Sequence, residues 1–155
     1  MTISLNFSTN SKQVQKKFDR LLKRFPKITR MGVTQAGEQL RKIILEKTDK
    51  GMRYDAGKFA KYSPQYEKAK NKTIVNLQDS NRMLQAIKSR TINNYKAVLQ
   101  FSNNEMEQRA YYHQTGQGNL PKRPFFGFNK KVENVIKNQF HNFVMKEIRK
   151  LGLWV

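Results

Sequence analysis

Apolar side chains recur every three or four residues along most of this 155-residue chain, and this helical spacing is the feature that most limits its possible folds. The longest such pattern follows Asn129, a residue type that caps helices, and ends at Gly152. Its apolar positions are Val132, Ile136, Phe140, Phe143, Val144, Ile148 and Leu151. The pattern predicts a long C-terminal helix with one apolar side.

Two further helical patterns occupy the first third of the chain. Ser11 is predicted to cap the first helix, whose apolar stripe lies opposite a basic one and consists of Val14, Phe18, Leu21, Leu22 and Phe25. A second pattern runs from Lys27 to about Lys47. Because proline lacks a backbone donor and clashes with the preceding turn, we expect Pro26 to end the first helix or begin the second. Gly51 then closes the second helix.

Signals for strands are short and few. Residues 3–7 alternate apolar and polar side chains, which predicts a short N-terminal strand. The runs SRTI (89–92) and YKAVLQFS (95–102) flank Asn93-Asn94, and asparagine suits tight turns, so we expect a hairpin. Its second strand presents Ala97, Leu99 and Phe101 on one face.

Three brief helices are predicted between and after these segments. One follows Ser63-Pro64, where serine caps the helix and proline occupies its first position. A second follows Asp79-Ser80 and extends to Ile87, and a third covers residues 105–113. Residues 51–63 show no period and are predicted to form a loop. The sequence therefore predicts an α+β fold, with helices packed on a small antiparallel sheet, in a single domain over residues 1–155.

The chain is strongly basic, with 31 Lys and Arg against 11 Asp and Glu and a formal net charge of +20. Such a charge attracts acidic partners, either nucleic acid or an acidic protein surface. A Lys-rich solvent-exposed surface would have the same composition, so the charge alone does not choose between these explanations. No cysteine is present, which excludes disulfides, thiolate metal sites and cysteine nucleophiles. No apolar run approaches the ~20 residues of a spanning helix, and we expect no membrane association.

Residues suited to catalysis are sparse. His113 and His141 are the only histidines, and no metal-ligand spacing joins them. His113 is suited to be a base but also to a structural hydrogen bond, and His141 is expected at the surface of the last helix. Asp49, Asp55 and Glu67 would form a nuclease-like site only if folding brought them together. We expect no enzyme activity, no metal and no cofactor.

Nucleic-acid binding has some support. Cationic side chains cover the first predicted helix, and aromatic residues accompany Lys58, Lys61, Lys122 and Arg123, as in grooves that bind single strands. No helix-turn-helix, zinc finger or RNA-stacking signature is present. If the chain binds nucleic acid, we therefore expect nonspecific contact with DNA.

Three segments occur in a distinctive order. They are YSPQYEKAK (62–70), LQDSNRMLQAI (77–87), and YYHQTGQGNLPKRPFFGF (111–128), with the predicted hairpin between the last two. This order resembles the phage virion morphogenesis family, the tail-completion and neck proteins of tailed phages related to the G protein of phage Mu. The likeness covers roughly residues 58 to 130, and the third segment is its most specific part. Asn81 and Phe126 depart from the glycine and leucine that are usual there.

The resemblance implies a structural role without catalysis. It implies a protein of the virion neck or tail end, assembled in the host cytoplasm, that forms a homo-oligomeric ring around the DNA channel, with a hexamer favoured. Its partners would be the head-tail connector and the tail tube or terminator proteins, with nonspecific contact to phage DNA as a further possibility.

The third segment is also the candidate interface. Gly116 and Gly118 permit positive φ and Pro121 stiffens the residues after it, so the segment is predicted to turn sharply and then to be rigid. We expect it to contact a neighbouring subunit through Tyr112, His113, Lys122, Arg123, Pro124, Phe125 and Phe126, since interfaces favour arginine and aromatic anchors. Alternatively, Phe125 and Phe128 fill the core of the domain itself.

Overall fold

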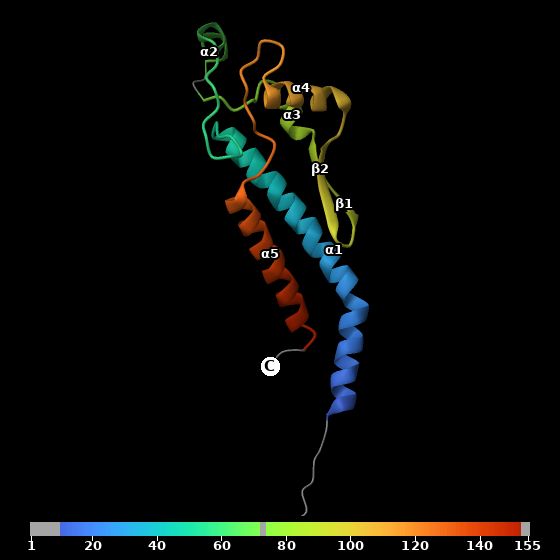
Figure 1. Cartoon of the computed structure of the whole chain (residues 1–155). Coiled ribbons are helices and arrows are strands. Elements are labelled where there is room, and N and C mark those ends of the chain that lie inside the picture. Colours follow the sequence, from blue (N-terminus) through green and yellow to red (C-terminus); the bar gives the residue numbers. More distant parts are fainter. Residues whose placement is uncertain (1–9, 72–73, 153–155) are drawn as a thin grey trace, which may run out of the picture.

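Five helices and a two-stranded antiparallel sheet make up the part of the chain that the computed structural model describes, residues 10–71 and 74–152 (Figure 1). The elements are α1 (Ser11–Asp49), α2 (Pro64–Lys70), α3 (Arg82–Gln85), β1 (Ile87–Asn93), β2 (Lys96–Phe101), α4 (Asn104–Thr115) and α5 (Lys130–Arg149). The predicted α+β class, including the long C-terminal helix, is confirmed. The strand predicted over residues 3–7 lies outside the described residues.

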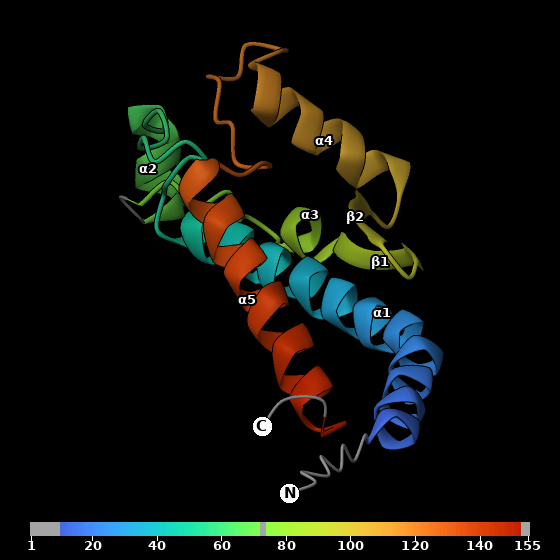
Figure 2. The same ribbon diagram turned by 60° about the horizontal axis from the view of Figure 1, so that its bottom comes forward.

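A single helix, α1, replaces the two helices predicted around Pro26. Pro26 lies inside α1, where it removes one backbone hydrogen bond. The helix continues because this region is exposed, and a carbonyl that lacks a donor costs less there than in a core. The Thr29 hydroxyl also donates to the carbonyls of Phe25 and Pro26, both at 3.0 Å. The N-terminal part of α1 is angled relative to the rest (Figure 2), the bend that an internal proline produces.

Helix α1 is the element on which α5 and the hairpin pack, one along each side (Figure 2). Glycines permit the close approach on both sides. A Cβ atom on Gly32 would lie 2.9 Å from Phe140 Cε2 of α5, and one on Gly37 would overlap the Ser89 hydroxyl of β1. These two positions therefore set the spacing of the three elements.

The hairpin pairs Ile87 with Phe101 and continues to Asn93 and Lys96, with an irregularity between Thr91 and Asn93. The turn residues are 94 and 95, one position later than predicted. The helix predicted from Asp79-Ser80 to Ile87 is wrong in extent. Helix α3 is a single turn, its N-cap is Asn81 without a side-chain cap bond, and Ile87 begins β1. The reason is tertiary, because Ile87 is completely buried in the core.

Side-chain caps begin α2, α4 and α5, as local sequence predicts. The cap predicted at Ser11 is wrong, because the N-cap of α1 is Asn10, which makes no side-chain cap bond. The Ser63 hydroxyl accepts from the Tyr66 amide at 3.3 Å at the start of α2. Asn103 Oδ1 accepts from the Met106 amide at 2.9 Å, and Asn129 Oδ1 accepts from the Val132 amide at 3.1 Å. The predicted starts of α2 and α5 and the predicted helix at 105–113 are thus confirmed.

The hydrophobic core lies at the end of the molecule opposite to the N-terminal part of α1. It joins the C-terminal half of α1 to the segments around α3, β1 and α4 and to Phe125; its buried members are Ile44, Phe59, Val75, Leu77, Met83, Leu84, Ala86, Ile87, Met106, Ala110 and Phe125. Within the described part of the chain, no helix is both long enough and apolar enough to cross a membrane.

Candidate functional site

The segment that follows α4 turns back sharply and runs alongside the end of that helix. Gly116 caps α4 with a φ of 81°, and its amide donates to the Tyr112 carbonyl at 2.8 Å. Gly118 and Asn119 also have positive φ. The Arg123 amide then donates to the His113 carbonyl at 2.7 Å. The exposed Pro121 lies within the turn, which therefore places Arg123 beside His113.

Arg123 is held inside the protein, with only 3% of its surface exposed. Its Nε donates to the Ala60 carbonyl and its Nη2 to the Lys61 carbonyl, both at 2.8 Å. The guanidinium carbon lies 4.8 Å from the centre of the Tyr62 ring, which is a cation-π contact. Arg123 thus clamps the segment before α2 from a position more than 60 residues later in the chain.

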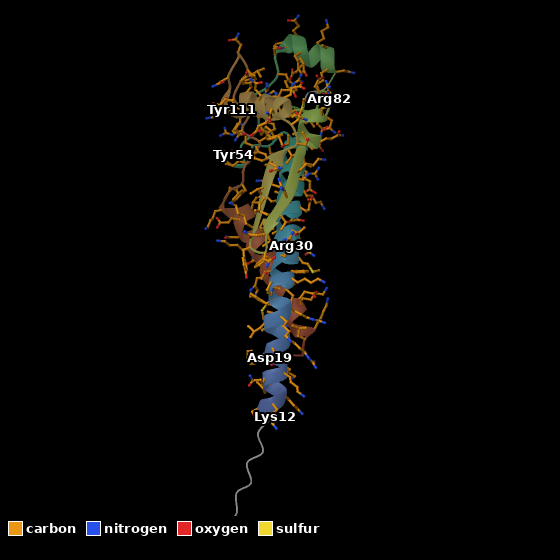
Figure 3. The ribbon with its side chains drawn as sticks, turned by 90° about the vertical axis from the view of Figure 1, so that its right-hand side faces the viewer. Lys12, Asp19, Arg30, Tyr54, Arg82 and Tyr111 are labelled. Atoms are coloured by element: carbon orange, nitrogen blue, oxygen red, sulfur yellow. The ribbon has the colours of Figure 1, made fainter. Side chains whose placement is uncertain are left out.

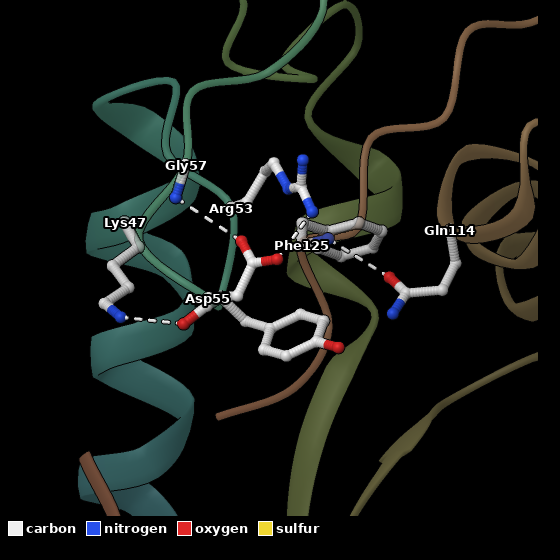
Figure 4. A network of polar contacts seen from close by, with 7 residues as sticks. Lys47, Arg53, Asp55, Gly57, Gln114 and Phe125 are labelled. Atoms are coloured by element: carbon white, nitrogen blue, oxygen red, sulfur yellow. Dashed lines mark hydrogen bonds and ion pairs between the residues drawn. The ribbon is translucent and has the colours of Figure 1, made fainter. Parts of the chain in front are cut away.

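Gln114 holds the chain immediately after Arg123. Its Oε1 accepts from the amides of Phe125 and Phe126, both at 3.1 Å, and its Nε2 donates to the Phe126 carbonyl at 3.0 Å. On the other side of this segment, the Tyr54 amide donates to the Pro124 carbonyl at 3.1 Å. Figure 4 shows Gln114 reaching Phe125, with the polar contacts of Lys47, Arg53 and Asp55 nearby.

Several residues predicted to form an interface are interior instead. Arg123, Pro124 and Phe125 are buried within this chain, and Arg123 Nε and Nη2 donate to the chain's own carbonyls. Contact of Arg123 with a neighbouring subunit stays a prediction. Phe125 fills the core, as the alternative interpretation held, whereas Phe128 is half exposed and does not.

The remaining predicted interface residues are more accessible. Lys122 is exposed, and Tyr112, His113 and Phe126 are partly buried. Phe126 packs against the Phe101 ring with centroids 5.2 Å apart. Tyr112 OH accepts from Gln108 Nε2 at 2.8 Å on the surface of α4. Lys122 is therefore the one exposed member of the predicted set.

Tyr62 joins the first two segments of the family-like order. Its hydroxyl accepts from the Leu77 amide and from Lys70 Nζ, both at 3.3 Å, and Lys70 Nζ also donates to Asn76 Oδ1 at 3.1 Å. Its ring lies 4.7 Å from the Tyr66 ring. Because Arg123 packs on the same ring, all three segments meet at Tyr62.

A pocket of about 370 Å³ lies at this meeting point. It is lined by Tyr62, Ser63, Tyr66, Leu77, Asp79, His113, Asn119, Leu120, Pro121 and Arg123. Each of the three segments contributes to its wall, and the turn at 119–121 closes one side. The pocket combines apolar walls with a few polar groups, which is the usual composition of a binding site.

The electrostatics of the pocket follow from burial. Burial lowers the pKa of His113 below its usual value, and the adjacent Arg123 cation lowers it further, so the imidazole is neutral near pH 7. Burial also lowers the pKa of Arg123, but a guanidinium remains protonated in proteins. Burial raises the pKa of the Tyr66 hydroxyl, and the nearby Asp79 carboxylate raises it further. The pocket therefore has a cationic side at Arg123 and an anionic one at Asp79.

The N-terminal part of α1, residues 11–25, forms a second notable feature that we call the arm. It extends away from the body of the protein past the end of α5 (Figure 1), with its side chains directed outward along its length (Figure 3). No residue of the arm is buried, and Ile28 is the first buried residue of α1. The apolar stripe predicted here exists but is uncovered: Phe18 is 55% exposed and Leu22 is 70% exposed.

The arm also concentrates positive charge. Asp19 is its one carboxylate, against six cations at Lys12, Lys16, Lys17, Arg20, Lys23 and Arg24. An isolated helix of this length is marginal in water, and in proteins such helices gain most of their stability from packing an apolar face. Within the described part of the chain, the arm therefore gains little stability from packing.

No metal-binding cluster is found among the described residues. No group of three or more His, Asp or Glu side chains there is arranged to hold a metal ion. Asp49 Oδ1 accepts from Gln78 Nε2, and Asp55 pairs with Arg53, so each has a local structural contact. His141 is exposed on α5.

Sequence reasoning missed two features of the site. It assigned Gln114 no role, because partners 11 and 12 residues away leave no local pattern. It recognised the arm's apolar stripe but not that the stripe is uncovered. Comparison with models of known protein families, with curated proteins and with solved structures finds no match to this chain.

Proposed function

We propose that this chain is a structural virion protein of a tailed phage that completes the tail or joins head and tail at the neck, as a ring of copies around the DNA channel. The observation that carries this proposal is the uncovered apolar stripe of the arm. A stripe with side chains as exposed as Phe18 and Leu22 suits a protein that acts by contacting others.

The geometry supports a contact between copies in a ring. Rings form through heterologous interfaces, in which one surface of a copy meets a different surface of the next. Such a contact lets the arm lie on the body of its neighbour and keeps the six cations of one arm away from those of another. The meeting of the three family-like segments at Tyr62 adds support, since their order suggested the neck proteins initially.

The test is the mass of the purified protein by light scattering at moderate salt, with and without a short DNA duplex. We expect a discrete multimer without DNA. Leu22→Glu should reduce it to monomers by placing a charge in the apolar contact, whereas Ile92→Glu, an equivalent change at an exposed site on β1, should not. A monomer that is also absent from virions of the phage encoding it would contradict the proposal.

A second candidate function is nonspecific DNA binding, and the six cations of the arm favour it. Binding of this kind weakens steeply with salt, because each neutralised phosphate releases counterions. Lys16→Gln and Lys23→Gln would then each weaken duplex binding and reduce the salt dependence by about one contact. Multimers that form only with DNA would favour this function over the first.

A further inference from the structure

Arg123 carries a charge that no carboxylate of the described residues balances. None of the ion pairs among those residues includes it, although it is almost completely buried. The Ala60 and Lys61 carbonyls and the Tyr62 ring satisfy part of its hydrogen-bonding and electrostatic demand, but none of them carries a negative charge. A buried cation without an anionic partner is costly.

The guanidinium also has hydrogen-bonding capacity to spare. Its two bonds to carbonyls use Nε and Nη2, so Nη1 makes no hydrogen bond with the described residues. Arg123 lines the 370 Å³ pocket, and so does His113, whose buried Nδ1 has no hydrogen-bond partner in the described part of the chain. Arg123 Nη1 is thus the polar group of this wall that is left for a ligand.

The other walls indicate what else the ligand carries. Tyr62, Leu77, Leu120 and Pro121 contribute apolar surface, which suits an aliphatic side chain. Asp79, on the anionic side, is an exposed carboxylate near the Tyr66 hydroxyl, and it has further acceptor capacity for a donor from the ligand. A simple aliphatic acid offers no such donor, whereas a peptide has backbone N–H groups beside its carboxylate and side chains.

We propose that this pocket binds a polypeptide segment that presents a carboxylate next to an apolar side chain. The carboxylate accepts from Arg123 Nη1, and the apolar side chain lies against Tyr62 and Leu120. The net charge of +20 steers acidic segments toward the protein. This site goes beyond the proposed function, because the pocket lies within one chain. A monomer and a ring are therefore equally able to bind such a segment.

The test uses the full ¹⁵N-labelled chain and three small probes, followed by chemical-shift changes in NMR spectra. N-acetyl-Ala-Leu carries the free carboxylate, its C-terminal amide removes only the charge, and 4-methylpentanoate keeps the carboxylate without peptide groups. We expect saturable shifts around His113 and Leu120 with the free acid peptide, and at least tenfold weaker binding of the amide and of 4-methylpentanoate.

A variant pair separates the pocket from general charge attraction. Leu120→Asp places a negative charge at the exposed rim of the pocket and should weaken binding of the free acid peptide at least tenfold. Ile92→Asp makes the same kind of change at an exposed site on β1, outside the pocket, and should leave binding unaltered. Unfolding curves of both variants verify that the fold is retained.

Four results would overturn the proposal. Equal binding of the acid and amide peptides would remove the role of Arg123. Equal binding of 4-methylpentanoate would reassign the site to free acids. An absence of saturable shifts, or equal weakening by Leu120→Asp and Ile92→Asp, would leave Arg123 as a structural clamp only. None of these results depends on whether the chain forms a ring.

Discussion

Replacing Gln114 with methionine should loosen the segment that carries Arg123 and Phe125. The Gln114 side chain makes three hydrogen bonds to the backbone of Phe125 and Phe126, each between 3.0 and 3.1 Å. Methionine has a similar length and is well tolerated in helices, so the substitution removes these bonds without a large change in volume or helix propensity.

The magnitude follows from the number of bonds. Each contributes about 0.5–1.5 kcal/mol net to stability, and the amides of Phe125 and Phe126 are left without this partner. Water reaches part of this region, because Phe126 is only half-buried, which limits the loss. We therefore expect Gln114→Met to lower the free energy of unfolding by about 2–4 kcal/mol, which corresponds to a fall in Tm of roughly 5–15 °C for a chain of this size.

Urea denaturation of the wild-type and variant chains measures this difference, and hydrogen exchange at the amides of Phe125 and Phe126 locates it. Gln108→Met is the matched control on the same helix. Its one hydrogen bond, to the Tyr112 hydroxyl, is exposed, so it should change stability by less than about 0.5 kcal/mol. If both variants are equally stable and the two amides keep their protection, the assigned role of Gln114 is refuted.

Two further predictions concern packing and pH. Gly32→Val should lower the free energy of unfolding in urea by about 1–3 kcal/mol, because a Cβ there would lie 2.9 Å from Phe140 Cε2. A second change, Phe140→Leu, should recover part of this loss. Equal stability of the wild type and Gly32→Val would refute the close approach. Burial, and then the Arg123 cation, lower the pKa of His113 in the folded state, so the unfolded chain takes up this proton first and stability falls as pH drops below the unfolded value of about 6.5. His113→Gln should therefore lose less stability than the wild type between pH 7.5 and 5, and an equal loss in both would contradict this assignment.

Local patterns accounted for those elements whose cause is local. The Ser63 and Asn129 caps and the apolar spacing after residue 129 predicted where α2 and α5 begin, because cap and amide are three residues apart. Around residues 82–87 the local pattern was misleading. Helical spacing there competes with strand pairing, and the burial of Ile87 in the core favours the strand.

Sequence alone determined the helical character of most of the chain, the hairpin, the strong positive charge and the sharp turn at Gly116. Tertiary structure alone decided what those elements do. Arg123 holds the carbonyls of Ala60 and Lys61, which lie more than 60 residues earlier in the chain, and Phe125 lies in the core. Both roles arise because folding brings distant segments together. The apolar stripe from Val14 to Phe25 has the spacing of a buried helix face, yet it is exposed. Amphipathic spacing specifies which face of a helix is apolar, but it does not specify whether another surface covers that face.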